Sequence, residues 1–151
     1  SDAKTDRIVA EHYGYRRLDE PIVHRREVVF EKTRAQWRVR DSLIGKGRHT
    51  FELTFHLVGD TIRVHRASSC EVRVEVQRSA TGRLVFEMEV EAPGSPEVGV
   101  LLSQEDVYIS YNRATKATML RLRCSSAVPF VICSIISVRG RMEPSAGASV
   151  A

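Results

Sequence analysis

Apolar and polar side chains alternate with a period of two along most of this chain, and this pattern constrains the fold more than any other feature. In residues 51–57 every second position is apolar, and the same alternation recurs in residues 70–76, 84–90 and 120–124. A period of two places apolar side chains on one face of a β-strand, whereas an amphipathic helix repeats every 3.6 residues. The pattern therefore predicts strands that each bury one face, with no helical stretch.

Turn-forming residues divide the alternating stretches into about ten or eleven short strands. Without crossover helices, successive strands pair antiparallel, and two stacked sheets are the usual way to bury many one-sided strands. We predict an all-β fold, an antiparallel β-sandwich without significant helix. The expected strands lie near residues 7–18, 21–32, 36–44, 48–57, 61–66, 70–78, 83–92, 98–103, 106–112, 117–125 and 129–141.

Two polar segments are predicted to be hairpin turns, because each separates two alternating runs: residues 79–82, Ser-Ala-Thr-Gly, and residues 57–61, Leu-Val-Gly-Asp-Thr. Residues 92–96 contain the Pro/Gly cluster of the fold and are predicted to be a loop. Residues 130–138 are apolar on both faces and follow Pro129. They predict a central strand that begins at the proline and is covered on both sides, or one that packs against another domain.

The length of the chain, 151 residues, suits one domain with a substantial core. We predict that residues 7–141 form the sandwich, between a flexible start at residues 1–6 and a flexible tail at residues 142–151, which is rich in Ser and Ala. No run approaches the ~20 apolar residues that a membrane span needs. The three cysteines, an odd number without a C-x-x-C pair, favour free and mostly buried thiols.

Arginine supplies nineteen of the twenty-three cationic residues, and nineteen acids bring the net charge to +4. The guanidinium group suits carboxylate, sulfate and phosphate, so a polyanion would fit as a partner. Because the arginines are interleaved with acids rather than clustered, solvated outer strand faces are the simpler interpretation. The chain has no basic helix and no aromatic RNA-binding signature, which argues against a nucleic-acid partner.

The sequence contains no P-loop, nucleophile elbow, dinucleotide-binding glycine motif or H-E-x-x-H motif. Its densest polar cluster is residues 11–17, which combine an acid, an imidazole, two phenols and two guanidinium groups around a glycine. Aromatic rings beside arginine suit a sugar ring that bears acid groups. The alternative is a strand whose tyrosines pad the edge of the core while its arginines face water. The residues alone leave both interpretations open.

Asp41 shares one face of a predicted strand with Trp37 and is therefore expected to be buried. A buried carboxylate needs a partner, which Arg25 or Arg26 on the preceding strand can supply through a bidentate ion pair. We interpret Asp41 as structural rather than catalytic. On the preceding strand, His24 and Arg26 alternate with Arg25 and are expected to share a face with Ile22, Val28 and Phe30. They predict either the basic lip of a polysaccharide groove or a cross-strand ladder with Asp41 or Glu52.

Four segments of the first third follow one another in a distinctive order: His-Tyr-Gly-Tyr-Arg-Arg-Leu at residues 12–18, Pro-Ile-Val-His-Arg-Arg at 21–26, Trp-Arg-Val-Arg-Asp at 37–41 and Gly-Lys-Gly-Arg-His at 45–49. In this order and spacing the chain resembles the late strands of the sandwich domain in heparinase II/III-type polysaccharide lyases. Two later segments, residues 107–112 and residues 129–132, extend the resemblance. It covers roughly residues 7–141.

The resemblance implies enzymes that cleave acidic polysaccharides by β-elimination with a helical toroid domain and a β-sandwich. The toroid and the His-Asn-Thr segment of the family's sandwich do not occur in this sequence. We therefore expect a C-terminal sandwich portion that supports the catalytic domain and the substrate cleft and is not catalytic alone. The alternative is a stand-alone carbohydrate-binding or protein-interaction sandwich.

The resemblance also implies partners and site residues. The expected partners are an acidic polysaccharide and an N-terminal helical toroid domain, in a bacterial enzyme that is periplasmic or secreted. His12 matches a family position near which some members hold a structural metal, so it is the metal-ligand candidate for a divalent ion in the full-length enzyme, and no cofactor is expected in the isolated chain. No catalytic residue is expected. The expected substrate-binding residues are Tyr13, Tyr15, Arg16, Arg17 and His24.

Overall fold

The computed structural model describes residues 3–57, 61–78, 83–91 and 97–138. These residues form ten β-strands, all paired antiparallel, and one turn of 3-10 helix, which confirms the all-β prediction. In this part of the chain no helix is long and apolar enough to cross a membrane. The elements are β1 (Thr5–His12), η1 (Gly14–Arg17), β2 (Ile22–Glu31), β3 (Gln36–Gly45), β4 (Arg48–Leu57), β5 (Thr61–Arg66), β6 (Glu71–Arg78), β7 (Arg83–Glu91), β8 (Val98–Ser110), β9 (Arg113–Ala127) and β10 (Phe130–Val138).

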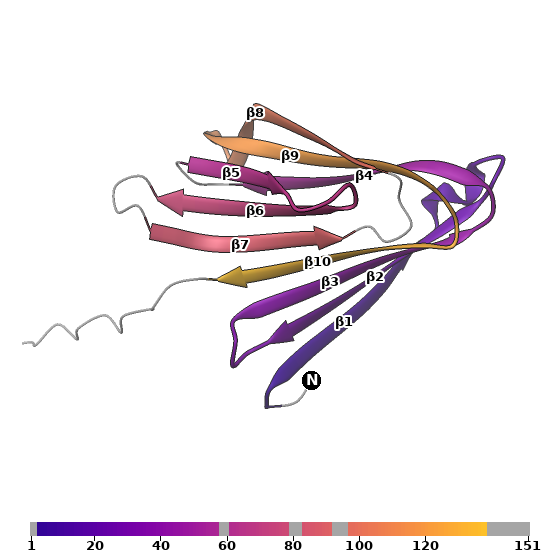
Figure 1. The fold of residues 1–151 in the computed structure, drawn as a ribbon, viewed down its shortest axis with the longest axis horizontal. Coiled ribbons are helices and arrows are strands. Elements are labelled where there is room, and N and C mark those ends of the chain that lie inside the picture. The colour runs from indigo at the N-terminus through magenta and orange to yellow at the C-terminus, as the bar shows by residue number, and fades with distance from the viewer. Residues whose placement is uncertain (1–2, 58–60, 79–82, 92–96, 139–151) are drawn as a thin grey trace, which may run out of the picture.

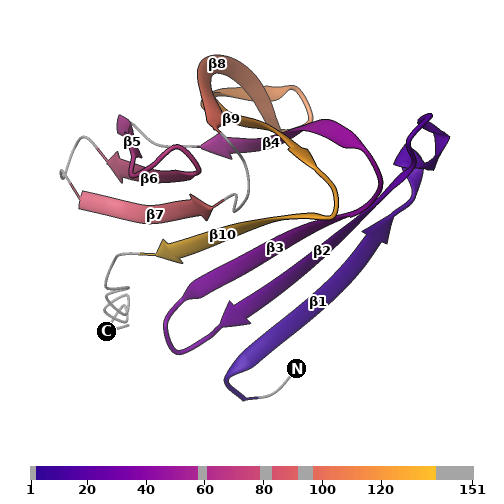
Figure 2. The same ribbon diagram turned by 45° about the vertical axis from the view of Figure 1, so that its right-hand side comes forward.

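The strands form two sheets of unequal width (Figure 1). The large sheet has seven strands in the order β1-β2-β3-β10-β7-β6-β5, and the small sheet has three in the order β4-β9-β8. The small sheet lies over the side of the large sheet that contains β5, β6 and β7, while β1, β2 and β3 fan out away from it (Figures 1 and 2). The fold is the predicted sandwich, but within the described residues the part of the large sheet formed by β1, β2 and β3 has no second sheet packed over it.

The hydrophobic core lies between the two sheets. Val72, Val74 and Val76 of β6 are 0% exposed and belong to one cluster with Leu120 and Leu122 of β9. The residues between them in the sequence are polar, so the buried face is the one that the alternation predicts. The other buried members of the cluster are Ile22, Leu43, Leu57, Val98, Cys124, Phe130 and Ile132.

The strand with two apolar faces, β10, is central in the large sheet, as its sequence predicts. It pairs with β3 on one side and with β7 on the other. Its inner face is buried at Phe130 and Ile132, whereas Val131 and Cys133 on the outer face are half-buried. Pro129 lies immediately before the first residue of the strand. The outer face of β10 is thus only partly covered by the described residues.

The structure corrects two predicted strand boundaries. The first strand, expected to continue to residue 18, ends at His12, because the chain turns at Tyr13 (φ −104°, ψ 2°) into η1. The strands expected at residues 98–103 and 106–112 are one strand, β8, which pairs with β9 from Val98 to Ser110 with one irregularity between Tyr108 and Ser110. The polar residues in the middle of β8 lie on an edge strand that water can reach, so they do not interrupt pairing.

The predicted hairpin at residues 57–61 is also wrong. β4 ends at Leu57 and β5 begins at Thr61, but β4 pairs with β9 in the small sheet and β5 pairs with β6 in the large sheet. This connection therefore passes from one sheet to the other. Strands β6 and β7 do pair antiparallel on either side of residues 79–82, and that turn itself lies outside the described residues, as does the loop predicted at residues 92–96.

Two further sequence predictions can be compared with the structure, the limits of the domain and the state of the cysteines. β1 begins at Thr5, inside the stretch expected to be a flexible start, while residues 1–2 and 139–151 lie outside the described residues. All three cysteines are free thiols, as predicted; Cys124 is buried, and Cys70 and Cys133 are half-buried.

Candidate functional site

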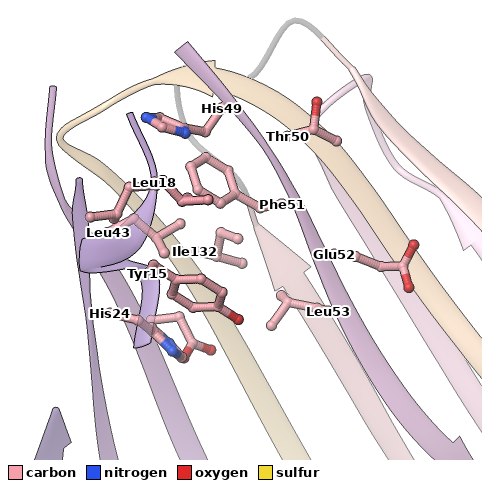
Figure 3. A pocket seen from close by; sticks show the side chains of 12 residues that line it. Tyr15, Leu18, His24, Leu43, His49, Thr50, Phe51, Glu52, Leu53 and Ile132 are labelled. Carbon is pink, nitrogen blue, oxygen red and sulfur yellow. The ribbon is translucent and has the colours of Figure 1, made fainter. Parts of the chain in front are cut away.

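A cavity of about 190 Å³ lies where η1, the inner face of the large sheet and strand β4 meet (Figure 3). Its wall is mostly apolar: Leu43, Phe51, Leu53 and Ile132 gather around it. The ring of Tyr15 closes one side. The cavity therefore combines an apolar interior with a polar rim, and it opens at the boundary between the covered and the uncovered parts of the large sheet.

In the turn that carries Tyr15, the His12 imidazole packs against Gly14. A Cβ atom at Gly14 would lie 2.5 Å from Cε1 of His12, so a larger residue there requires the exposed imidazole to move. The His12 ring also meets the Tyr15 ring edge-on, with the ring centroids 5.2 Å apart. The backbone N–H of Arg16 donates to the carbonyl of Tyr13 at 3.0 Å and closes the turn. The short polar segment after β1 thereby directs Tyr15 toward the cavity.

The segment around η1 exposes Tyr13, Arg16 and Arg17 to solvent. The Arg16 guanidinium lies over the Tyr13 ring, 4.5 Å from its centroid. The Tyr13 hydroxyl donates a hydrogen bond to the Glu11 carboxylate, and this bond raises the pKa of Tyr13 above its ordinary value. The phenol therefore stays protonated at neutral pH, so Tyr13 is suited to donate a hydrogen bond and poorly suited to act as a base.

Asp41 in β3 holds an ionic cluster in the cavity wall. Its side chain is 3% exposed, accepts hydrogen bonds from Arg26 at 2.7 and 3.0 Å, and lies 2.6 Å from Nε2 of His24. The register of β2 and β3 places Arg26 opposite Asp41, whereas Arg25 is opposite Ser42 on the other face. Of the two arginines that the sequence offers as partners, Arg26 is the correct one. We call Asp41, Arg26 and His24 the Asp41 cluster.

His24 and Arg26 thus form the predicted cross-strand ladder, and their acidic partner is Asp41 rather than Glu52. Glu52 also lines the cavity, but its carboxylate lies 3.7 Å from Nε of Arg121 in β9. Three hydrogen-bonding contacts offset the cost of burying the Asp41 carboxylate. The cluster fixes the ring of His24 at the cavity.

Strand β4 contributes residues to the cavity, although the alternation in its sequence predicts only a buried strand face. Phe51 and Leu53 line the cavity, and His49 lies at its upper end in Figure 3. The imidazole of His49 is fixed by the turn before β4, where Nε2 donates to the carbonyl of Lys46 at 2.8 Å. In this turn Gly47 has φ +83°, which favours glycine. Alternation marks Phe51 and Leu53 as inward-facing, but it does not show that β4 would be an edge strand.

The structure brings some of the expected binding residues together and separates others. Tyr15 and His24 both line the cavity. Tyr13 and Arg16 form a separate exposed pair beside it, and Arg17 is exposed at the end of η1. Their role in substrate binding stays a prediction.

The metal prediction for His12 also stays untested. Among the described residues there is no group of three or more His, Cys, Asp or Glu side chains that could hold a metal ion. His12 is exposed, and its backbone is opposite His24 in the β1–β2 register. A metal at His12 would need further ligands from another segment, so no chemistry of this chain is derived through a metal.

Comparisons with known proteins agree with this fold. The family model described as heparinase II/III-like, C-terminal, matches residues 1–147. The heparan sulfate lyase HepC from Pedobacter heparinus has a similar structure, with a TM-score of 0.68 and 15% identity over 95% of this chain and 21% of that one. A structure of heparinase III gives a TM-score of 0.63 and 19% identity over 93% of this chain and 21% of that one. No curated protein matches the sequence.

A further heparinase III gene product gives a TM-score of 0.67 and 14% identity, over 90% of this chain and 20% of that one. The chain thus spans about a fifth of the length of these solved structures. At these identities the structures establish the shared fold, while the family match covers both sheets and every residue of the cavity. This chain belongs to the heparinase II/III-like C-terminal family.

Proposed function

We propose that this chain is the C-terminal sandwich portion of a heparinase II/III-like lyase that cleaves an acidic polysaccharide by β-elimination. The observation that carries the proposal is the family match over residues 1–147 in a chain about one fifth as long as the solved heparinase III and heparan sulfate lyase structures. In this role the sandwich supports an N-terminal helical toroid domain and forms one wall of the substrate cleft. The parent enzyme is periplasmic or secreted.

The surface around η1 is the part of the chain that we assign to the polysaccharide. Arg16 and Arg17 are exposed there beside Tyr13 and Tyr15, whose side chains are 49% and 44% exposed. Guanidinium groups bind carboxylate and sulfate through paired hydrogen bonds, and tyrosine offers an apolar face with a polar tip. His24, held by Asp41, adds a fixed polar group at the adjoining cavity.

In this proposal the chain has no lyase activity of its own. β-Elimination needs a base for the proton beside the uronate carboxylate. Tyr13 does not suit that role because its pKa is raised, and Nε2 of His24 is engaged by Asp41. In this proposal the remainder of the parent enzyme supplies the base. His12 would serve as one ligand of a structural divalent metal in the complete enzyme.

Binding of the isolated chain to heparin, heparan sulfate, alginate and pectin, measured at two salt concentrations, tests the proposed role in the cleft. We expect saturable binding to one of these glycans that persists at moderate salt. Arg16→Ala should weaken it at least about tenfold, because a charge-assisted hydrogen bond contributes ~1.5–3 kcal/mol and a factor of ten corresponds to about 1.4 kcal/mol. Tyr15→Ala should weaken it as well.

Arg34→Ala is the matched control, since Arg34 follows β2 at the end far from η1 and pairs with Glu31 on the surface. It should leave glycan binding unchanged. Weak binding to all four glycans that disappears with added salt would contradict the cleft-wall role, because such binding is only screened charge attraction. Binding by the isolated chain that is as strong and as selective as binding by the complete lyase would instead favour a self-contained carbohydrate-binding module.

A further inference from the structure

Strand β4 has a free edge within the described part of the chain. It ends the small sheet, pairs with β9 on one side, and has no strand on the other. An edge strand presents unpaired backbone N–H and C=O groups that can accept another strand. The large sheet continues under and beyond this edge for three more strands, β3, β2 and β1.

Beyond the Asp41 cluster, the inner face of those three strands carries an apolar patch that is incompletely covered. Val28 of β2 and Val39 of β3 are directly opposite each other and half-buried, and Ile8 of β1, next in the same row, is 67% exposed. Phe30 and Trp37 stack in the following row with their centroids 4.5 Å apart, and both are half-buried. A continuous row of this kind in the inner face of a sandwich indicates a missing partner layer.

The cavity runs along the free edge of β4. Phe51 and Leu53 of β4 form one wall, and Leu43 and Ile132 of the large sheet form the floor. Apolar cavities of about 150 Å³ are large enough for a benzene ring. The volume of about 190 Å³ at this edge therefore suits one aromatic or large aliphatic side chain.

We propose that an extended segment of polypeptide pairs with the free edge of β4, places one apolar side chain in the cavity and covers Val28 and Val39. Main-chain hydrogen bonds along an edge and pockets for alternate side chains are the two parts of strand addition. The segment comes from the remainder of the same lyase, since this chain spans about a fifth of the length of its solved relatives. This assignment of the partner depends on the proposed function.

Hydrogen exchange of β4, compared between the isolated chain and the longer lyase polypeptide, tests the docking. We expect the amides of residues 48–57 that do not bond to β9 to exchange at least tenfold more slowly in the longer polypeptide. The amides of β9 are the internal control, because this strand is paired on both sides in either form. Lyase activity of the longer polypeptide is measured separately, so a failure of the proposed function is distinguishable from a failure of strand docking.

Leu53→Trp fills the cavity and should abolish the added protection of β4 in the longer polypeptide. Leu101→Trp is its matched control, since Leu101 is exposed on β8 at the opposite edge of the small sheet and should leave that protection intact. Far-UV circular dichroism of both variants verifies that they fold. Equal exchange in the two polypeptides overturns the proposal, and so does protection of β4 that grows with the concentration of the isolated chain, because the occupant is then a second copy.

Discussion

The covered and uncovered parts of the large sheet share one sequence pattern and differ in burial. In β6, under the small sheet, alternate valines such as Val72 and Val74 are 0% exposed. In β1, which the small sheet does not reach, Ile8 occupies the same kind of inward position and is 67% exposed. Alternation therefore specifies which face of a strand turns inward, and a second layer decides whether that face is buried.

Where the small sheet no longer covers the large sheet, ion pairs and stacked rings connect the strands. The Asp41 cluster lies at this boundary, and beyond it the rings of Phe30 and Trp37 stack with an interplanar angle of 16°. On the outer surface, Glu31 forms an ion pair with Arg38 at 3.1 Å. The uncovered part is thus held by directional contacts, whereas the covered part is held mainly by burial of apolar area.

The largest effect should come from a cavity in the covered part. Leu120→Ala removes a side chain that is 0% exposed between the sheets and should lower the free energy of unfolding by about 2–5 kcal/mol. Ile8→Ala, in the uncovered part, should change it by less than about 0.5 kcal/mol. Urea denaturation of both variants measures the difference. Similar losses of unfolding free energy for the two variants would show that burial does not distinguish the covered part of the sheet from the uncovered part.

A smaller effect is expected at the boundary. Asp41→Ala leaves Arg26 and His24 without their shared acceptor and should cost about 1–3 kcal/mol, less than a fully buried pair because the Arg26 side chain is 46% exposed. Lys116→Ala breaks an exposed pair with Asp106 and should cost below about 1 kcal/mol. Thermal and urea unfolding compare the two. If Asp41→Ala were as mild as the control, the cluster would not stabilise the boundary.

The smallest effects are expected from ion pairs at the surface of the two sheets, and these effects should be similar in the covered and uncovered parts. Hydrogen bonds from Arg121 and Ser103 lower the pKa of Glu105 in the small sheet, and a hydrogen bond from Arg7 lowers the pKa of Glu27 in the uncovered part. NMR titration should place both midpoints below the ordinary value of about 4.3. Arg121→Gln should raise the midpoint of Glu105 and leave that of Glu27 unchanged; an unmoved Glu105 would contradict the assigned cause.

The pH dependence follows from the direction of these shifts. Because the folded state lowers the pKa of Glu105, it favours the ionised carboxylate more than the unfolded chain does. The resulting contribution to stability is complete above the unfolded pKa of about 4.3 and decreases as the pH falls through the lower folded-state pKa. Arg121→Gln should make acid unfolding less steep in that range.

Much of the fold and part of the site follow from particular residues. The two apolar faces of residues 130–138 correctly predict a central strand, and the inward position of Asp41 correctly predicts a buried carboxylate with an arginine partner. The choice between Arg25 and Arg26 required the register of β2 against β3. The turn at residues 57–61 was misassigned because a hairpin and a connection between sheets use the same turn residues.

Strand positions and the identity of the inward face are local properties, since alternation depends only on neighbouring side chains along one strand, and the family resemblance rests on segments contiguous in sequence. Sheet order is a long-range property. Only the pairing of β4 with β9, which places Phe51 opposite Cys124, leaves β4 as an edge strand. That edge and the bend of η1 create the cavity between Tyr15 and Leu53. A site formed by residues so far apart in sequence arises from the packing of the sheets, which no local pattern encodes.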